Sequence, residues 1–118
     1  MSSQDLYSIP EIDVETLADA LQRGPIPVQL LDVREPQELA IARLTEFQNI
    51  PLSQFAEWSG SITEQLDIHQ ETWVMCHHGM RSAQVCQWLS QNGFTNVKNI
   101  SGGIDAYSLK IDSSIPRY

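Results

Sequence analysis

The sequence predicts an α/β fold with a mainly parallel sheet that helices cover on both faces. Two observations lead to this prediction. Short apolar segments alternate with amphipathic segments along the chain, which is the order of a parallel sheet with crossover helices. The segment VQLLDV, residues 28–33, lacks the polar alternation of a sheet with one wet face and is typical of a strand covered on both sides.

The first half of the chain supplies helices and strands in turn. Apolar residues recur at helical spacing between Ile12 and Gly24, after a short lead-in, and Gly24 with Pro25 ends that helix. Pro36 suits the first turn of a second helix, because a backbone N–H has no helical partner there. The elements expected in this half are a helix within residues 12–24, strands at 28–33 and 47–51, a helix at 36–42 and a helical stretch at 53–58.

The second half continues the alternation around a short polar loop. The apolar run at residues 72–75 predicts a strand, and a helix over residues 82–91 follows and ends at Asn92 and Gly93. Residues 96–100 predict the last short strand, in front of a glycine pair. Because ligand sites of such sheets lie beyond the carboxyl ends of the strands, we expect the site in the loop that follows residues 72–75.

Length and composition indicate one domain over residues 1–118. This length is enough to bury roughly two thirds of the surface that the unfolded chain exposes, and no repeat or long linker divides it. The apolar runs are too short to span a membrane and the start lacks the features of a secretory signal, so we expect a cytoplasmic protein without a membrane partner. Its two cysteines are expected to be free thiols. A net charge of −8 argues against nucleic acid as a partner.

The loop CHHGMRS, residues 76–82, combines residues that suit thiolate and anion chemistry. Cys76 directly follows the apolar strand and precedes the helix, so backbone N–H groups and the positive end of the helix dipole converge on it. Both favour the thiolate, the nucleophilic form of cysteine. Gly79 suits the positive φ of a tight loop, and Arg81 offers a guanidinium fork for an oxyanion or for a carboxylate that braces the loop. Cys76 is therefore the candidate nucleophile.

The remaining cysteine and histidines have simpler interpretations. Cys86 shares a helix face with apolar residues and is expected in the core, and His69 is expected in a solvated loop. Two interpretations stay open for His77 and His78: solvent-facing loop residues, or protonated side chains that help to hold an anionic substrate. Three consecutive residues rarely direct their side chains to one ion, and no second Cys or His cluster supplies a fourth ligand, so we predict neither a metal nor another cofactor.

Four segments in the same order resemble landmarks of the rhodanese family of sulfurtransferases. The stretch CHHGMRS is similar to the family's active-site loop, in which a cysteine begins a six-residue loop that ends in arginine. The resemblance covers nearly the whole chain and implies a rhodanese-like fold. The other three segments are LDVREPQEL at residues 31–39, NIPL at 49–52 and SGGIDAY at 101–107.

One segment departs from the family pattern. Between Leu39 and Asn49 the family usually has a Gly-His pair and then a Gly-Ala pair. This chain has Ala42 with Arg43 and then Glu46 with Phe47 at those places. The departure concerns the local turn and its packing, so the role of residues 40–48 is open.

The resemblance implies a mechanism in two half-reactions. Cys76 would attack the outer sulfur of a donor anion such as thiosulfate, expel sulfite and keep the sulfur as a persulfide. A thiophilic acceptor, which is cyanide, a cellular thiol or a group on an acceptor protein, would then take the sulfur. The residues expected to bind substrate are His77, His78, Gly79, Met80, Arg81 and Ser82.

Other functions remain as alternatives on the same fold. A related group of phosphatases places five residues between its cysteine and arginine, a wider cradle that suits phosphate. Here four residues lie between Cys76 and Arg81, and no general acid is evident, so sulfur transfer is favoured over phosphoryl transfer. A sulfur carrier that serves one partner protein shares the persulfide step, whereas a non-catalytic binding module would not need Cys76.

Three polar residues follow the strand at residues 28–33 at its carboxyl end: Asp32, Arg34 and Glu35. In one interpretation they brace turns and cap the next helix. In the other interpretation, the carboxylate of Asp32 or Glu35 holds Arg81 in position without contacting the substrate. The sequence leaves both interpretations open.

Overall fold

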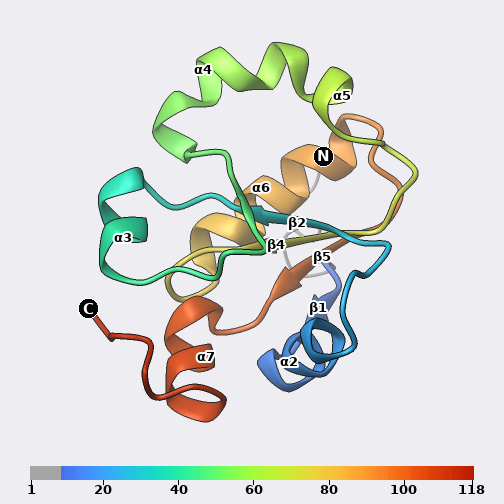
Figure 1. The fold of residues 1–118 in the computed structure, drawn as a ribbon. Helices are drawn as coiled ribbons and strands as arrows, with labels where there is room; N and C mark the ends of the chain where they lie inside the picture. The colour runs from blue at the N-terminus through green and yellow to red at the C-terminus, as the bar shows by residue number, and fades with distance from the viewer. Residues whose placement is uncertain (1–8) are drawn as a thin grey trace.

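Five parallel strands form the sheet, in the order β1-β5-β4-β2-β3 (Figure 1). The computed structural model describes residues 9–118, so residues 1–8, on which the expectation about a secretory signal partly rests, lie outside the described residues. β4 lies at the centre of the sheet, between β2 and β5, and contributes the strand that leads into the loop. The strands are β1 (Glu11–Ile12), β2 (Gln29–Asp32), β3 (Gln48–Asn49), β4 (Thr72–Met75) and β5 (Val97–Ile100).

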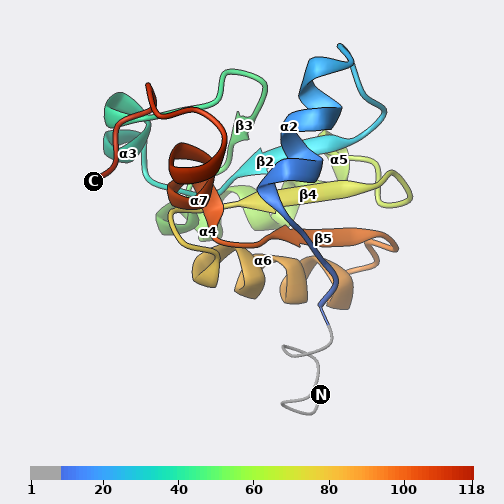
Figure 2. The ribbon, with the colours of Figure 1, turned by 90° about the horizontal axis from the view of Figure 1, so that it is seen from below.

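Helices cover both faces of this sheet, as Figure 2 shows for α2 and α7 on one side and α6 on the other. The fold class expected from the sequence, α/β with a parallel central sheet and helices on both faces, is therefore confirmed. None of the helices within residues 9–118 has the length and apolarity that crossing a bilayer requires. The helices are α2 (Val14–Gln22), α3 (Pro36–Ile41), α4 (Phe55–Trp58), α5 (Ile62–Gln65), α6 (Met80–Gln91) and α7 (Gly103–Lys110), with short 3₁₀ turns η1 (Leu52–Gln54) and η2 (Ser59–Ser61).

Side chains of β4 alternate between two hydrophobic clusters, one on each face of the sheet. Val74 and Cys76 pack with residues of α4, α5 and α6, whereas Trp73 and Met75 pack with residues of α2 and α7. All four are buried. Since strand side chains point alternately to opposite faces, a strand covered on both sides needs apolar residues at every position, and this explains the unbroken apolar run before Cys76.

Local signals in the sequence set where the helices begin. The Asp13 carboxylate accepts a hydrogen bond from the Thr16 backbone N–H at 2.7 Å and caps α2. At α3, Glu35 and Glu38 form a capping box around Pro36, which stands in the first turn. Helix α6 begins after Gly79, whose φ of 106° lies in the left-handed region that favours glycine.

Several elements differ from the expectation. β1 is a two-residue edge strand where only a lead-in was expected, because so short a segment shows no periodicity. α7 was not predicted, since the glycine pair before it normally indicates a turn. α6 begins at Met80, two residues before the predicted start, so part of the loop already belongs to the helix.

The segment that departs from the family pattern packs through its own apolar side chains. Ala42 and Phe47 are both buried and belong to the cluster on the side of α2 and α7. Ala42 also ends α3, with its backbone N–H donating to the Glu38 carbonyl oxygen. Hydrophobic packing therefore holds this segment against the α2 and α7 side of the sheet.

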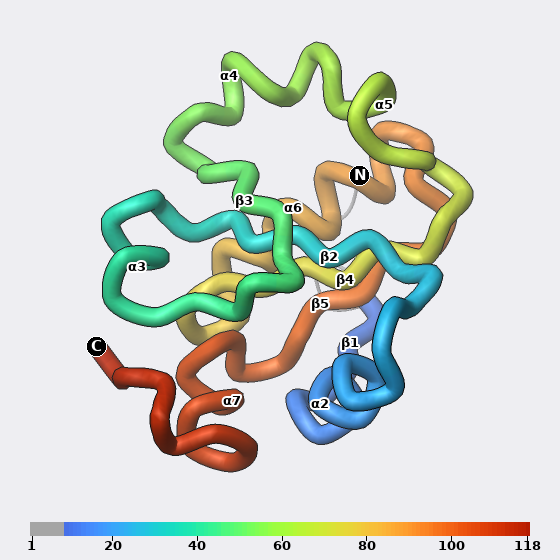
Figure 3. The backbone as a smooth tube through the Cα atoms, viewed as in Figure 1, coloured from blue at the N-terminus to red at the C-terminus, as the bar shows by residue number. Residues whose placement is uncertain are grey.

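The chain segment after α7 returns to the carboxyl side of the sheet and ends beside α3 (Figure 3). Its last residue, Tyr118, contacts Glu38 of α3 through a hydrogen bond of 2.9 Å. This return brings together residues that are 80 positions apart in the sequence and places an aromatic ring next to the loop.

Candidate active site

Cys76 lies at the carboxyl end of the central strand, and the loop after it wraps around its sulfur. The Gly79 backbone N–H donates to Cys76 Sγ at 3.1 Å, and the Ser82 hydroxyl lies 3.2 Å from the same atom. The residue is only 1% exposed, so water has almost no access to the sulfur. The Gly79 N–H is thus a fixed donor to this buried sulfur, and the Ser82 hydroxyl lies within reach of it.

Two glycines allow this loop to close. Gly79 holds a positive φ of 106°, and its backbone supplies the N–H that reaches the sulfur. Gly103 lies where a Cβ atom would stand 2.3 Å from the Cys76 carbonyl oxygen and 2.5 Å from that of His77. Because position 103 has no side chain, the first turn of α7 lies directly against the loop. Its N–H groups at Ile104 and Asp105 then donate to those two carbonyl oxygens, at 3.0 and 3.1 Å.

Ser82 joins the sulfur to a buried asparagine. Its hydroxyl lies 2.6 Å from Asn99 Oδ1 in β5, and both residues are buried. Asn99 Nδ2 donates to the Gly79 carbonyl oxygen at 3.0 Å, which fixes Oδ1 toward Ser82. A hydroxyl has one hydrogen, so Ser82 donates either to Asn99 or to a negatively charged Cys76.

Arg81 turns its guanidinium to a carboxylate. Its Nη1 and Nη2 each donate to one oxygen of Glu38 at 2.8 Å, in the bidentate arrangement. These bonds from Arg81 lower the pKa of Glu38 from 4.5 to about 2 and raise the pKa of Arg81. Arg81 is therefore braced by a carboxylate, which is one of the two roles that the sequence allowed for it.

The carboxylate that braces Arg81 is neither Asp32 nor Glu35. Asp32 pairs with Arg34, at 2.7 Å between Oδ2 and Nη2, and both side chains are buried. Glu35 caps α3 and accepts hydrogen bonds from the backbone N–H and the hydroxyl of Ser53. These three residues thus brace turns and cap a helix, as the simpler interpretation held, and Glu38 faces Arg81 from the first turn of α3.

His77 lies between two rings. The Tyr118 ring stacks on it with 3.9 Å between centroids, and the His78 ring lies 3.8 Å away on a tilt of 32°. Burial and, after it, the neighbouring His78 lower the pKa of His77 below 6.5, so it is neutral near pH 7. Its buried Nε2 finds no hydrogen-bond partner within residues 9–118. A protonated His77 that attracts an anion does not fit these surroundings.

Among the described residues, one group of side chains has metal-ligand chemistry: His77, His78 and Asp105, with ligand atoms within 4.8 Å of one another. The Asp105 carboxylate already accepts from Arg117 Nε at 2.9 Å and lies 3.8 Å from His78 Nε2. A closed structural zinc site uses four ligands, whereas this group offers three, and one of these is engaged in an ion pair. We therefore assign the group to the packing of the loop.

The other residues named from the sequence lie apart from the sulfur chemistry. Met80 is 76% exposed and lies at the surface beside Arg81. Cys86 is fully buried in the cluster on the α6 face, and burial raises the pKa of its thiol, so it belongs to the core as expected. His69 is exposed, also as expected.

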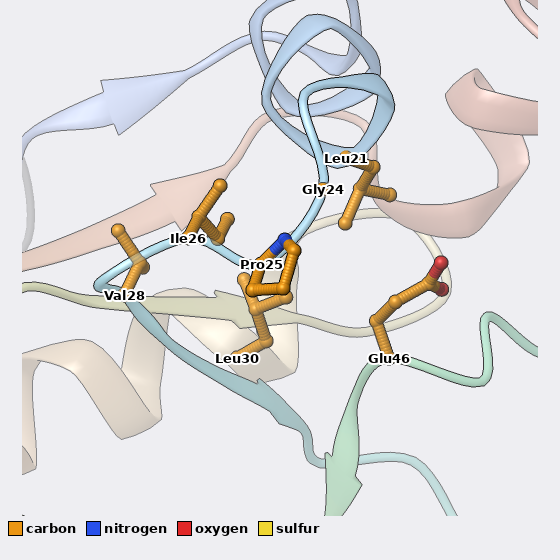
Figure 4. A pocket seen from close by; sticks show the side chains of 7 residues that line it. All are labelled: Leu21, Gly24, Pro25, Ile26, Val28, Leu30 and Glu46. Carbon is orange, nitrogen blue, oxygen red and sulfur yellow. The ribbon is translucent and has the colours of Figure 1, made fainter.

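A pocket of about 480 Å³ lies beside the beginning of β2, and Figure 4 shows the residues that line it. It is mostly apolar and contains no nucleophile, and its one charged side chain is Glu46. Its wall includes residues at the beginning of β2, whereas Cys76 follows the end of β4. The lining residues are Leu21, Gly24, Pro25, Ile26, Val28, Leu30 and Glu46.

Comparison with known proteins places this chain among described relatives. The family model of the rhodanese-like domain matches residues 13–110. The chain is 48% identical over 113 residues to rhodanese-like/PpiC domain-containing protein 12, chloroplastic, of Arabidopsis thaliana, and this match covers 93% of the chain and 38% of the relative. It is 35% identical over 95 residues to adenylyltransferase and sulfurtransferase MOCS3-1 of Zea mays, covering 78% of the chain and 20% of that protein. The chain thus spans much less than two thirds of either relative.

Solved structures agree with this placement. The crystal structure of a rhodanese-related protein from Thermoplasma volcanium superposes with a TM-score of 0.69 at 31% identity, over 91% of this chain and 95% of the other. The residues matched by the family model, 13–110, include the strand, loop and helix around Cys76. The chain belongs to the rhodanese-like domain family.

Proposed function

We propose that the protein is a sulfurtransferase that holds sulfane sulfur as a persulfide on Cys76. The observation that supports this most directly is the Gly79 N–H that donates to Cys76 Sγ at the end of a central strand, with the Ser82 hydroxyl beside the same atom. Donors fixed in advance around one atom stabilise a charge that develops there. Membership of a family with sulfurtransferase relatives supports the same class of reaction.

The proposed first half-reaction moves one sulfur atom. The Cys76 thiolate attacks the outer sulfur of thiosulfate, a new S–S bond forms to Cys76, and the bond between the two donor sulfurs breaks. Sulfite leaves with the bonding electron pair and two negative charges, and one negative charge stays on the persulfide. In the second half-reaction a thiophile such as cyanide or a thiol attacks the outer sulfur and restores the Cys76 thiolate.

Two other functions would differ from sulfur transfer, one in the acceptor of the sulfur and the other in the atom that Cys76 attacks. A sulfur carrier would load Cys76 in the same way but deliver only to one partner protein. A cysteine-dependent phosphatase would attack phosphorus instead, and four residues between Cys76 and Arg81 make a narrow cradle for phosphate. Both terminal nitrogens of Arg81 are also engaged by Glu38, which is unfavourable for binding a phosphoryl group.

Loading of the persulfide tests the shared step. The purified protein is treated with thiosulfate, and its intact mass is measured with and without a reductant. We expect a gain of one sulfur atom that the reductant removes, no gain in Cys76→Ser, and an unchanged gain in the matched control Cys86→Ser. Unloaded wild-type protein, or loading of Cys76→Ser, contradicts the proposal.

Steady-state turnover then separates the three functions. Thiocyanate formation from thiosulfate and cyanide is measured beside hydrolysis of p-nitrophenyl phosphate. We expect thiocyanate with no phosphate release; loading without turnover indicates a carrier, and phosphate release indicates a phosphatase. The cytoplasmic location expected from the sequence remains a prediction, which fractionation of the source cells tests.

A further inference from the structure

The loop's arginine carries its charge in a closed ion pair. Both terminal nitrogens of Arg81 donate to Glu38 at 2.8 Å, and the Arg81 side chain is 33% exposed. Within residues 76–82, Arg81 is the residue with a permanent positive charge. An anionic donor that enters the loop therefore meets an arginine whose charge Glu38 already balances.

Glu38 is held in this position by two further hydrogen bonds. The Glu35 backbone N–H donates to its Oε2 at 2.9 Å, and the Tyr118 hydroxyl donates to its Oε1 at 2.9 Å. Tyr118 in turn accepts from Arg34 Nη1 at 2.9 Å, and Arg34 is itself paired with Asp32. The carboxylate thus has donors from three residues, and it cannot turn away from Arg81 without losing several bonds.

Two other basic side chains around the loop also add no free positive charge. Arg117 pairs with Asp105 at 2.9 Å, next to His78. His77 is neutral near pH 7, because burial lowers its pKa. With a net charge of −8 on the whole chain, the described charged side chains around Cys76 give an anion little electrostatic attraction.

We propose that Glu38 is a specificity-determining residue that makes the loop discriminate against donors with two negative charges. This inference rests on the proposed sulfur transfer at Cys76. The favoured donors carry a total of one negative charge or none, as thiosulfonates and persulfides do. With a thiosulfonate, Cys76 thiolate takes the outer sulfur as a persulfide, the S–S bond of the donor breaks, and the sulfinate leaves with the bonding electrons.

Two donors that differ mainly in charge test this. Thiosulfate carries two negative charges, whereas methanethiosulfonate has a methyl group in place of one charged oxygen and carries one. Glu38→Gln removes the negative charge that balances Arg81, so the net charge around the loop becomes more positive by one. For a donor charge about 6 Å away in water, Coulomb's law gives a rise in kcat/KM of about tenfold for thiosulfate and about threefold for methanethiosulfonate. The ratio of the two donors shifts about threefold.

Glu71→Gln is the matched control. Glu71 also pairs with a cation, Lys98 at 3.0 Å, and its substitution changes the net charge equally, but it precedes β4 while Cys76 follows it. We expect Glu71→Gln to leave the ratio of the two donors at the wild-type value. A ratio that does not move in Glu38→Gln, or that moves equally in both variants, overturns the proposal.

The wild-type protein gives a second test that needs no substitution. Raising the salt concentration from about 10 to 150 mM shortens the Debye length from about 30 to 8 Å. If Arg81 is balanced, salt screens the repulsion of thiosulfate by the acidic chain, and its KM falls. A KM that rises with salt shows a free cation that attracts the donor and contradicts the proposal. Failure of Cys76 to load from either donor contradicts the proposed function instead.

Discussion

The Tyr118 ring stacks on the His77 ring, with 3.9 Å between centroids and an angle of 5° between the planes. The contact joins the end of the described chain to the second residue of the loop that begins at Cys76. The same tyrosine donates a hydrogen bond to Glu38, which holds Arg81. One residue therefore supports two positions of the loop, one through stacking and one through its hydroxyl.

Replacing this ring should change the titration of His77. In Tyr118→Ala the loss of the ring exposes His77 to water, and since burial is the main cause of its lowered pKa, the pKa rises toward 6.5. NMR titration of the His77 ring protons measures this rise. Tyr118→Phe keeps the stacking and serves as the control, with a His77 pKa close to that of the wild type. A His77 pKa that stays low in Tyr118→Ala shows that the ring does not desolvate it.

Glu38 should contribute to the loss of stability in acid. Its pKa of about 2 in the folded protein lies below the usual 4.5, so its contribution is complete above pH 4.5 and is lost as the pH falls toward 2. After allowance for partial exposure, the loss is about 2 kcal/mol. Urea unfolding at a series of pH values measures it. Glu38→Gln should lack this part of the pH dependence, and a variant that loses stability in acid as steeply as the wild type refutes the assignment.

Ser82→Ala should slow sulfur transfer and also weaken the fold. It removes the hydroxyl beside Cys76 Sγ and leaves buried Asn99 Oδ1 without its partner. A hydrogen bond to a charged group corresponds to a rate loss of about tenfold to hundredfold, and the unpaired amide oxygen costs about 1–3 kcal/mol of stability. Turnover with cyanide and urea unfolding measure the two effects.

Ser108→Ala separates these effects of Ser82→Ala. Ser108 is also buried, and its hydroxyl donates to the Ile115 carbonyl oxygen, away from the sulfur. We expect a comparable loss of stability with an unchanged rate. If Ser82→Ala loses stability alone and keeps its rate, its hydroxyl has no part in stabilising charge on Cys76.

The sequence was sufficient to predict the fold and the place of Cys76 at the end of a buried strand. The apolar run before Cys76, the glycine in the loop and the helix after it are local patterns, and local patterns can be read from one sequence. Gly79 has the positive φ that was expected of it, and Cys86 is in the core. These predictions hold because each depends on neighbours along the chain.

The partners of the loop could not be predicted in the same way. Glu38, Asn99 and Tyr118 reach the site from α3, β5 and the segment after α7, and their contacts depend on how these elements pack. The sequence did contain one partial signal, since Glu38 stands in the first turn after Pro36 and hence on a helix at the same edge of the sheet. Choosing it over Asp32 or Glu35 required knowing that those two acids have partners elsewhere.

Gly103 should be the most sensitive glycine of the chain for activity. In Gly103→Ala the new methyl group would stand 2.3 Å from the Cys76 carbonyl oxygen, so the loop or α7 has to move, and a φ of 60° adds strain. We expect a loss of stability of more than about 2 kcal/mol, together with a loss of persulfide loading from thiosulfate. Thermal unfolding and intact-mass measurement check the two expectations.

Gly24→Ala is the control that separates the contact from the strain. Gly24 has a φ of 89°, also in the left-handed region, but a Cβ atom there would meet nothing within 4 Å. We expect about 1 kcal/mol of destabilisation from the backbone strain alone and full loading of Cys76. If Gly103→Ala loads as well as Gly24→Ala, the close approach of α7 to the loop is not what holds the sulfur in position.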